Sequence, residues 1–234
     1  MKKRIGVNGT IIFLSFVLVI LFPAWFMRFS ATRPHKIVAV AGVVLLLTGL
    51  LLRVSSRGYK SDFSKNGHAL VEGGPYALVR NPMYLGILCI GTGVVCVLFQ
   101  WWILVLFYGV FLTRYYTLIL AEEKKLTEVF GRHYETYVQS VPRLFPRPQA
   151  LFRMNPLDYL PLRFRWLQRE WPNLILVPIA IVALGYWQSY RLLEEPVSLR
   201  QAAVMLAVLG CFILFASCLA KRYETNSVQS KNRS

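Results

Sequence analysis

The sequence predicts an all-α protein, a polytopic transmembrane helix bundle of about six membrane helices with both termini in the cytoplasm. Hydrophobic residues make up 56% of the 234-residue chain, and its mean hydropathy is +0.46. Soluble domains contain about 45–50% apolar residues, so this composition favours a membrane protein. The net charge is +16, and the basic residues concentrate in alternate loops between apolar segments.

Six apolar windows approach the length of about 20 residues that crosses a bilayer. The second and third are short, which favours local tilting or thinning of the membrane. The first follows a basic start and ends in aromatic residues, which favours a retained anchor over a cleaved signal peptide. The windows are Thr10–Met27, Ile37–Leu52, Tyr84–Phe99, Trp101–Leu120, Leu174–Tyr190 and Ala202–Ala220.

The distribution of Lys and Arg predicts the orientation. If the N-terminus lies inside and six helices alternate, 22 of the 27 basic residues fall on the cytoplasmic side. This positive-inside bias places both termini in the cytoplasm. It also indicates attraction to anionic membrane lipids and argues against a nucleic-acid partner. The remaining basic residues are Arg28, Arg33, Lys36, Arg191 and Arg200.

Changes in composition divide the chain into five segments. We expect an N-terminal transmembrane hairpin, a functional core, an interfacial basic and aromatic segment, a C-terminal transmembrane hairpin and a disordered tail. Their ranges are 1–52, 53–148, 149–172, 173–222 and 223–234.

Four cysteines fall inside the predicted membrane helices. Apolar helices are poor sites for a disulfide framework, and the spacing matches no metal-binding pattern. We therefore expect small apolar packing residues and no metal site. The cysteines are Cys89, Cys96, Cys211 and Cys218.

The segment Gly67–Tyr84 is polar and rich in turn residues, although it lies beside a predicted membrane hairpin. Asn81-Pro82 is typical of a helix start, with Asn at the N-cap and Pro in the first turn. The positive end of such a helix attracts carboxylate or phosphate, and Arg80 adds a cation. The alternative is a plain helix entry in which Arg80 reaches lipid phosphates.

Glu122 and Glu123 lie near the predicted membrane boundary, on the same side as that segment. Ionisable groups at such depth are costly and are usually paired or functional. Together with Gly67–Tyr84 they therefore predict a site. The alternative is a surface run countered by Lys124 and Lys125.

These motifs resemble the isoprenylcysteine carboxyl methyltransferases, part of a wider group of membrane methyltransferases that includes phospholipid N-methyltransferases. The resemblance covers about Gly67–Pro148 and depends on the order of the motifs. They are His68–Val71, Gly74-Pro75-Tyr76, Arg80 to Gly86, Glu122 to Leu126, Phe130-Gly131, Tyr134, Tyr137, Val141-Pro142-Arg143 and Pro146.

The resemblance implies that S-adenosylmethionine is held at the cytoplasmic ends of the helices. A helix start beside Arg80 suits its carboxylate, Glu122 suits its amino group or ribose hydroxyls, and apolar walls suit adenine. The implied cofactor-binding residues are His68, Ala69, Leu70, Val71, Tyr76, Asn81, Pro82, Met83, Tyr84 and Glu122, to which the charge beside the helix start adds Arg80.

Two positions depart from the family pattern. Asn81 stands where the family commonly has His, so an ionic role is lost there. Leu118 stands where the eukaryotic prenylcysteine enzymes have an arginine that faces the substrate carboxylate. Arg114, one turn earlier, is the candidate to replace it. These departures weaken the case for a prenylcysteine acceptor.

The expected reaction is methyl transfer to a lipophilic acceptor, either a prenylcysteine-type carboxylate or a lipid amine, with the acceptor's tail entering between helices. Positioning and the exclusion of water would supply most of the catalysis. A protonated amine would need a base, for which Glu123 and His68 are candidates. Two alternatives remain: an NADPH-dependent membrane reductase of the sterol type, and a non-catalytic membrane scaffold.

Overall fold

The computed structural model describes residues 23–27, 33–64, 67–147, 159–192, 207, 210–223 and 225. Within these residues the chain is helical and has no β-strand, which confirms the all-α prediction; an isolated antiparallel bridge joins Met27 and Phe99. Most of the first predicted span lies outside the described residues, and so does the segment on which the choice between an anchor and a signal peptide depends. Nearly all of the tail after Tyr223 lies outside them as well. The helices are α2 (Pro23–Phe26), α3 (Arg33–Phe63), α4 (Pro75–Leu78), α5 (Pro82–Leu98), α6 (Trp101–Phe130), α7 (Arg132–Ser140) and α10 (Phe164–Leu192).

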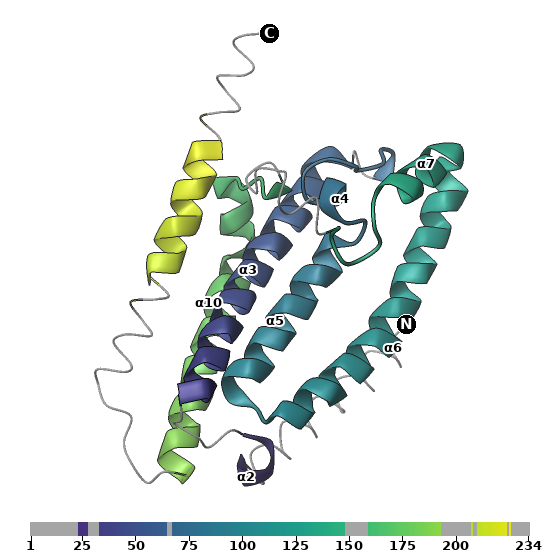
Figure 1. Ribbon diagram of the computed structural model, residues 1–234. Helices are drawn as coiled ribbons and strands as arrows, with labels where there is room; N and C mark the ends of the chain where they lie inside the picture. Colours follow the sequence, from purple (N-terminus) through teal and green to yellow (C-terminus); the bar gives the residue numbers. More distant parts are fainter. Residues whose placement is uncertain are drawn as a thin grey trace, which may run out of the picture.

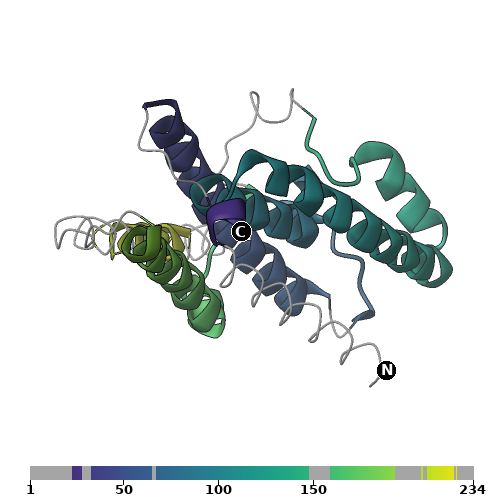
Figure 2. The same ribbon diagram turned by 90° about the horizontal axis from the view of Figure 1, so that it is seen from below.

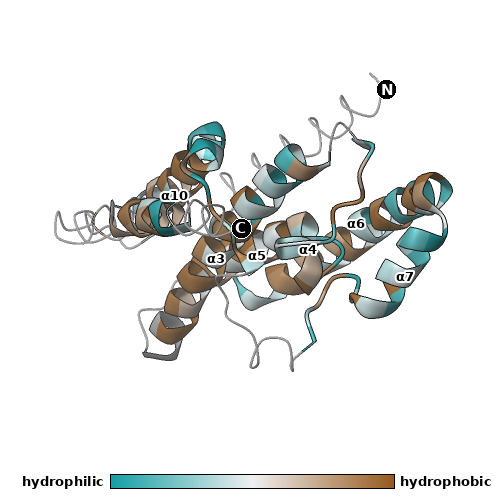
Figure 3. Cartoon of the chain, turned by 90° about the horizontal axis from the view of Figure 1, so that it is seen from above, coloured by the Kyte–Doolittle hydropathy of each residue, from teal (hydrophilic) through white to brown (hydrophobic). Residues whose placement is uncertain are grey.

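Three described helices contain stretches long and apolar enough to cross a membrane: Ile37–Phe63, Trp101–Phe130 and Phe164–Trp187. A shorter apolar helix, Pro82–Leu98, lies between the first two in the chain. Large apolar side chains such as Val105 stay exposed on the outside of the bundle, as a lipid-facing surface requires. Figure 3 shows hydrophobic colour along α3, α5, α6 and α10, with hydrophilic colour gathering on α7.

Close backbone contacts at glycines join α3 to α5. A Cβ added to Gly49 would lie 2.7 Å from the carbonyl oxygen of Gly86, and one added to Gly93 would lie 2.5 Å from that of Gly42. Both approaches are too close for any side chain, so glycine is required at these crossing points. Small residues that let two backbones approach are a common way to pack membrane helices. The two helices lie side by side in Figure 1.

Helix α3 is longer than predicted. The second predicted span ends at Leu52, but the helix continues to Phe63. Ser55 and Ser56 lie within this extension, and their buried hydroxyls donate to the carbonyl oxygens of Pro161 (2.6 Å) and Leu52 (2.6 Å). Bonding of this kind lets polar residues lie inside a helical core. The longer helix carries its last turn to the candidate site.

Helices α5 and α6 form the predicted hairpin, which turns at Phe99 and Gln100. The backbone N–H of Gln100 donates to the carbonyl oxygen of Phe26 (2.9 Å), and its side chain donates to that of Met27 (3.0 Å). From this turn α5 and α6 diverge toward the end that carries α4 and α7 (Figure 1). The hairpin is therefore anchored at its closed end and widens toward the other.

The stretch 121–140, which follows the fourth predicted span, is divided between two helices. α6 runs without interruption to Phe130, and Gly131 then breaks the helix with φ 51° and ψ −127°. This is a conformation that glycine adopts and other residues avoid. The chain therefore turns sharply before α7.

Helix α10 combines the end of the predicted interfacial segment with the fifth predicted span. It includes Pro172 and Pro178, and no helix break separates the two segments at 172. Its first turns pack into a buried cluster with α3 and the terminal helical residues 210–223, which lie beside α10 in Figure 2. The cluster is Leu46, Leu50, Val54, Leu162, Trp166, Leu167, Leu174, Phe212, Ala216 and Ala220.

Candidate functional site

A cavity of about 340 Å³ opens at the wide end of the α5–α6 hairpin. It is bounded by the last turns of α3 and α6, the segment that follows α3, the start of α5, and α7. Small-molecule sites have volumes of this order or larger. The lining residues are Lys60, Ser64, Gly67, Ala69, Leu70, Val71, Tyr76, Arg80, Asn81, Pro82, Met83, Tyr84, Glu122, Leu126, Phe130, Tyr134 and Tyr137.

The start of α5 is held by a distant segment of the chain. The helix begins at Pro82, as predicted, but the Asn81 side chain makes no capping hydrogen bond. Instead its amide donates to the carbonyl oxygen of Arg143 (3.1 Å), which also accepts the Asn81 backbone N–H (3.2 Å). The backbone N–H of Arg80 donates to the carbonyl oxygen of Pro142 (2.8 Å). Asn81 therefore occupies the predicted N-cap position, but its side chain joins two segments instead of capping the helix.

Glu122 faces the cavity from α6 and is held by two partners. Lys60, near the end of α3, donates to Oε1 (3.0 Å), and the Tyr84 hydroxyl donates to Oε2 (2.9 Å). Tyr84 also contacts the Tyr115 ring, with centroids 5.4 Å apart. The carboxylate therefore joins three helices across the mouth of the site.

Glu123 has a different environment from its neighbour. Its side chain is 12% exposed, and Arg143 binds both of its oxygens through Nε (3.1 and 3.2 Å) and Nη2 (2.9 Å). Arg80 Nη1 lies 3.3 Å from Oε1. The hydrogen bonds that Arg143 donates to Glu123 raise the pKa of Arg143, whose guanidinium also lies over the Tyr116 ring. Two guanidinium groups thus form ion pairs with this carboxylate.

Arg80 has an unused donor at the cavity wall. Its side chain is 9% exposed, and its Nε is buried without a hydrogen-bond partner. Buried donors are seldom left unpaired, so this atom indicates an anionic or polar ligand. It lies beside the start of α5, where the helix dipole also favours an anion. The donor set therefore fits a ligand that carries a carboxylate.

Three tyrosines form the floor between α4 and α7. The Tyr137 hydroxyl donates to the carbonyl oxygen of Tyr76 (2.6 Å), and the Tyr76 hydroxyl donates to that of Ser56 (3.4 Å). Burial raises the pKa of the Tyr76 and Tyr137 phenols, and it raises that of Tyr134 as well. These groups are therefore neutral donors at physiological pH.

Ten of the residues predicted from the sequence line the cavity: Ala69, Leu70, Val71, Tyr76, Arg80, Asn81, Pro82, Met83, Tyr84 and Glu122. The three candidate catalytic residues do not. His68 and Arg114 are exposed outside the lining, and Glu123 lies in the ion cluster with Arg80 and Arg143. Their roles stay predictions.

Sequence reasoning did not assign six lining residues to the site. Four of them, Leu126, Phe130, Tyr134 and Tyr137, belong to the motifs of the family resemblance, and that was the signal available. Lys60 and Ser64 gave no signal, because both lie beyond Leu52, where the second predicted span ends. Lys60 lies on the extension of α3 beyond Leu52, and Ser64 directly follows that helix.

Part of the chain matches a known protein family. Residues 37–133 match the model of the phospholipid methyltransferase family, a segment shorter than half of the chain. The match runs from α3 through the start of α5 to the beginning of α7, and it confirms the resemblance to membrane methyltransferases for this segment. Searches of curated proteins and of solved structures found no match.

Proposed function

We propose that this protein is an S-adenosylmethionine-dependent methyltransferase that modifies a lipophilic acceptor at the cytoplasmic face of a membrane. The observation that carries the proposal is the cavity between α3, α5 and α6, which combines an unpartnered buried Arg80 donor with the Glu122 carboxylate. The match of residues 37–133 to the phospholipid methyltransferase family supports the same reaction class.

The lining residues suit the three chemical parts of S-adenosylmethionine. Arg80 Nε and the start of α5 suit its carboxylate. Glu122 suits its amino group or ribose hydroxyls, while Leu126 and Phe130 provide apolar walls for adenine. When bound, the cofactor supplies a methyl group activated by a sulfonium centre.

The chemistry of the acceptor decides whether a base is needed. A carboxylate acceptor is already a nucleophile, whereas a protonated amine must first lose a proton. Among the lining residues Glu122 is the carboxylate, while Glu123 is occupied by Arg80 and Arg143. If the acceptor is an amine, we therefore favour Glu122 over Glu123 or His68 as the proton acceptor.

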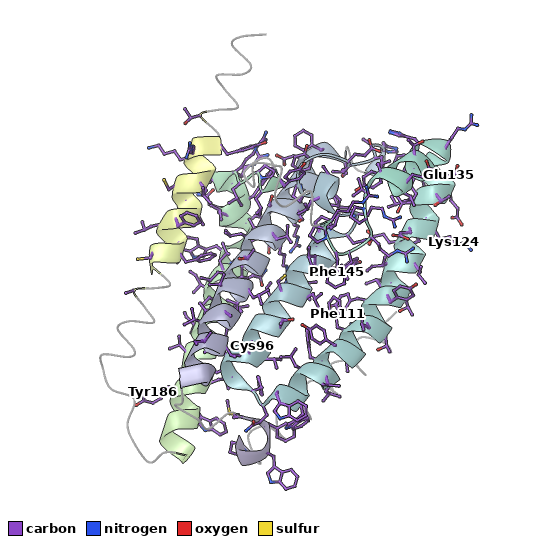
Figure 4. All side chains as sticks on the ribbon, in the orientation of Figure 1. Cys96, Phe111, Lys124, Glu135, Phe145 and Tyr186 are labelled. Atoms are coloured by element: carbon purple, nitrogen blue, oxygen red, sulfur yellow. The ribbon has the colours of Figure 1, made fainter. Side chains whose placement is uncertain are left out.

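The acceptor's apolar tail would approach from the bilayer, between the diverging ends of α5 and α6. Phe111 lies between the two helices, and Phe145 lies above it on the segment that follows α7 (Figure 4). Phe145 is 65% exposed, so it offers an apolar contact at this opening. A prenyl or acyl chain would suit such a surface.

The bias of basic residues supports a cytoplasmic location for the site. Lys60, Arg80, Lys124 and Lys125 all lie toward the end of the bundle that carries the cavity. Basic residues gather on the cytoplasmic side of membrane proteins. A water-soluble cofactor would then enter from the cytoplasm and the acceptor from the membrane.

The test is cofactor binding followed by transfer. Purified full-length protein in detergent would be titrated calorimetrically with S-adenosylmethionine and separately with NADPH, then incubated with methyl-labelled S-adenosylmethionine and membrane lipid extract. We expect saturable binding of S-adenosylmethionine alone, and label in a lipid-soluble product. Binding of NADPH alone would favour a reductase.

Two variants distinguish a methyltransferase from a scaffold. Glu122→Ala and Tyr76→Ala are expected to weaken binding of S-adenosylmethionine, because both residues line the cavity. If both variants bind like the unmodified protein, the cavity is not the cofactor site.

A further inference from the structure

The last turn of α3 has two faces with different partners. Lys60 and Ser64 face the cavity. Asp62 lies between them in the sequence and about 200° around the helix from Lys60, which is nearly the opposite side. There it accepts hydrogen bonds from Arg163 Nη1 (2.9 Å) and Trp166 Nε1 (3.1 Å) at the start of α10.

The start of α10 contacts this end of α3 at several further points. Gly58 lies so close to Trp166 that an added Cβ would be 2.2 Å from the indole ring. One turn along α10, the buried Glu170 carboxylate pairs with Arg57 (2.7 Å). The Arg163 guanidinium lies over the Trp166 ring, 5.3 Å from its centroid. Packing, ion pairing and hydrogen bonding from the start of α10 therefore act over the last two turns of α3.

A terminal helical turn needs such support. Its last carbonyl groups have no partners within the helix, so helix ends fray unless tertiary contacts hold them. Lys60 is in this turn, and its ammonium group binds Glu122 (3.0 Å) at the mouth of the cavity. Lys60 therefore lies in a terminal turn whose other side contacts the start of α10.

We propose that the start of α10 positions the cofactor site, and that Asp62 is a positioning residue which acts through Lys60 on Glu122. The inference rests on the proposed function and extends it. It gives a role to a part of the chain beyond residue 133, where the family match ends. A preorganised Glu122 binds a ligand without first being ordered.

A double-mutant cycle tests this coupling. The dissociation constant of S-adenosylmethionine would be measured calorimetrically for the unmodified protein, Asp62→Ala, Lys60→Ala and the double variant. We expect Asp62→Ala to raise it about threefold to tenfold in the unmodified background and to have no further effect beside Lys60→Ala. An equal effect in both backgrounds, or none in either, would overturn the proposal.

Two companion variants distinguish a specific effect on binding from general damage to the fold. Trp166→Phe removes the N–H donor to Asp62 but keeps an aromatic ring against Gly58, so a smaller rise in the same constant is expected. Arg165→Ala is the matched control. The Arg165 guanidinium is exposed, and its nearest approach to Asp62, 4.0 Å, is too long for a hydrogen bond. Arg165→Ala should leave binding unchanged.

A readout without cofactor separates failure of this inference from failure of the proposed function. The maleimide labelling rate at Ser64→Cys, followed by mass spectrometry of that peptide, should rise when Asp62→Ala is added. If S-adenosylmethionine does not bind the unmodified protein, the proposed function fails, and this rate still tests whether α10 holds the turn. An unchanged rate contradicts the inference.

Discussion

Glu122 and Glu123 are adjacent in the chain, yet their carboxylates have different partners. Glu122 is 36% exposed at its side chain and bonds to Lys60 and Tyr84 at the cavity. The Glu123 side chain lies outside the cavity lining and forms ion pairs with Arg80 and Arg143. Adjacent residues on a helix point about 100° apart, so one of the pair can face a ligand while the other neutralises buried cations.

Loss of the Glu122 charge should weaken cofactor binding. Glu122→Gln keeps the size of the side chain but removes a charge-assisted hydrogen bond to a cationic ligand. We expect the dissociation constant of S-adenosylmethionine to rise about tenfold. Calorimetric titration would measure it, with Glu128→Gln on the exposed surface of α6 as the control. Equal affinities in all three proteins would count against a ligand at Glu122.

Loss of the Glu123 charge should instead affect stability. Glu123→Gln leaves Arg80, which is 9% exposed at its side chain, beside a neutral partner. Breaking a buried ion pair in this way costs about 3 kcal/mol. A lower midpoint of thermal unfolding in detergent is expected, again with Glu128→Gln as the control. A midpoint that matches the control would show that the cluster adds little.

At the scale of elements, the corner between α6 and α7 depends on one backbone conformation. Gly131 has φ 51°, and no atom lies within 4 Å of the position that a Cβ would occupy. A substitution there therefore tests the backbone alone. The corner matters because α7 brings Tyr134 and Tyr137 to the cavity.

Gly131→Ala should destabilise the protein by about 1–3 kcal/mol, because alanine adopts this conformation only with strain. Gly109→Ala is a matched control within α6, where there is also open space around the Cβ position and no positive φ. The control should be neutral or stabilising, since alanine favours helices. Thermal unfolding in one detergent would compare them. Equal midpoints would show that the corner relaxes.

The contact between α4 and α7 should make stability sensitive to alkaline pH. Burial raises the pKa of Tyr76, Tyr134 and Tyr137 above the ordinary phenol value of 10.0. The unfolded state therefore loses these protons first, so the free energy of unfolding is unaffected below about pH 10 and falls as pH rises above it.

Unfolding midpoints measured from pH 8 to pH 11.5 would show this fall. The slope should be smaller in Tyr137→Phe, which lacks one of the three phenols, even if that variant is less stable overall. An unchanged slope in Tyr137→Phe would contradict the assignment of this pH dependence to the tyrosine cluster.

At the scale of the whole molecule, the cavity should face the cytoplasm and the α5–α6 turn the opposite side. Cysteines introduced at Glu128 and Trp101 would report on the two ends of α6. A membrane-impermeant maleimide applied to intact cells should label Trp101→Cys and reach Glu128→Cys only after permeabilisation. The reverse pattern would invert the topology.

The helical architecture and half of the site could be predicted because they depend on local signals. Hydropathy predicted the apolar helices, and Asn81-Pro82 predicted the start of α5. The contacts of Lys60 with Glu122 and of Asn81 with Arg143 could not be predicted, since each joins segments about 60 residues apart. Segment boundaries failed where tertiary contacts satisfy polar groups, as at Ser55, or where a helix continues through proline, as at Pro172.

The α5–α6 hairpin is fixed at both ends. Its closed end is bonded to Phe26 and Met27, and at its open end Tyr84 must meet Glu122. One residue inserted between Trp101 and Glu122 would move the carboxylate about 1.5 Å along α6 and turn it about 100° away from Tyr84. Insertions and deletions in this stretch should therefore abolish cofactor binding even where apolar substitutions are tolerated. Its length is as much a part of the site as its side chains.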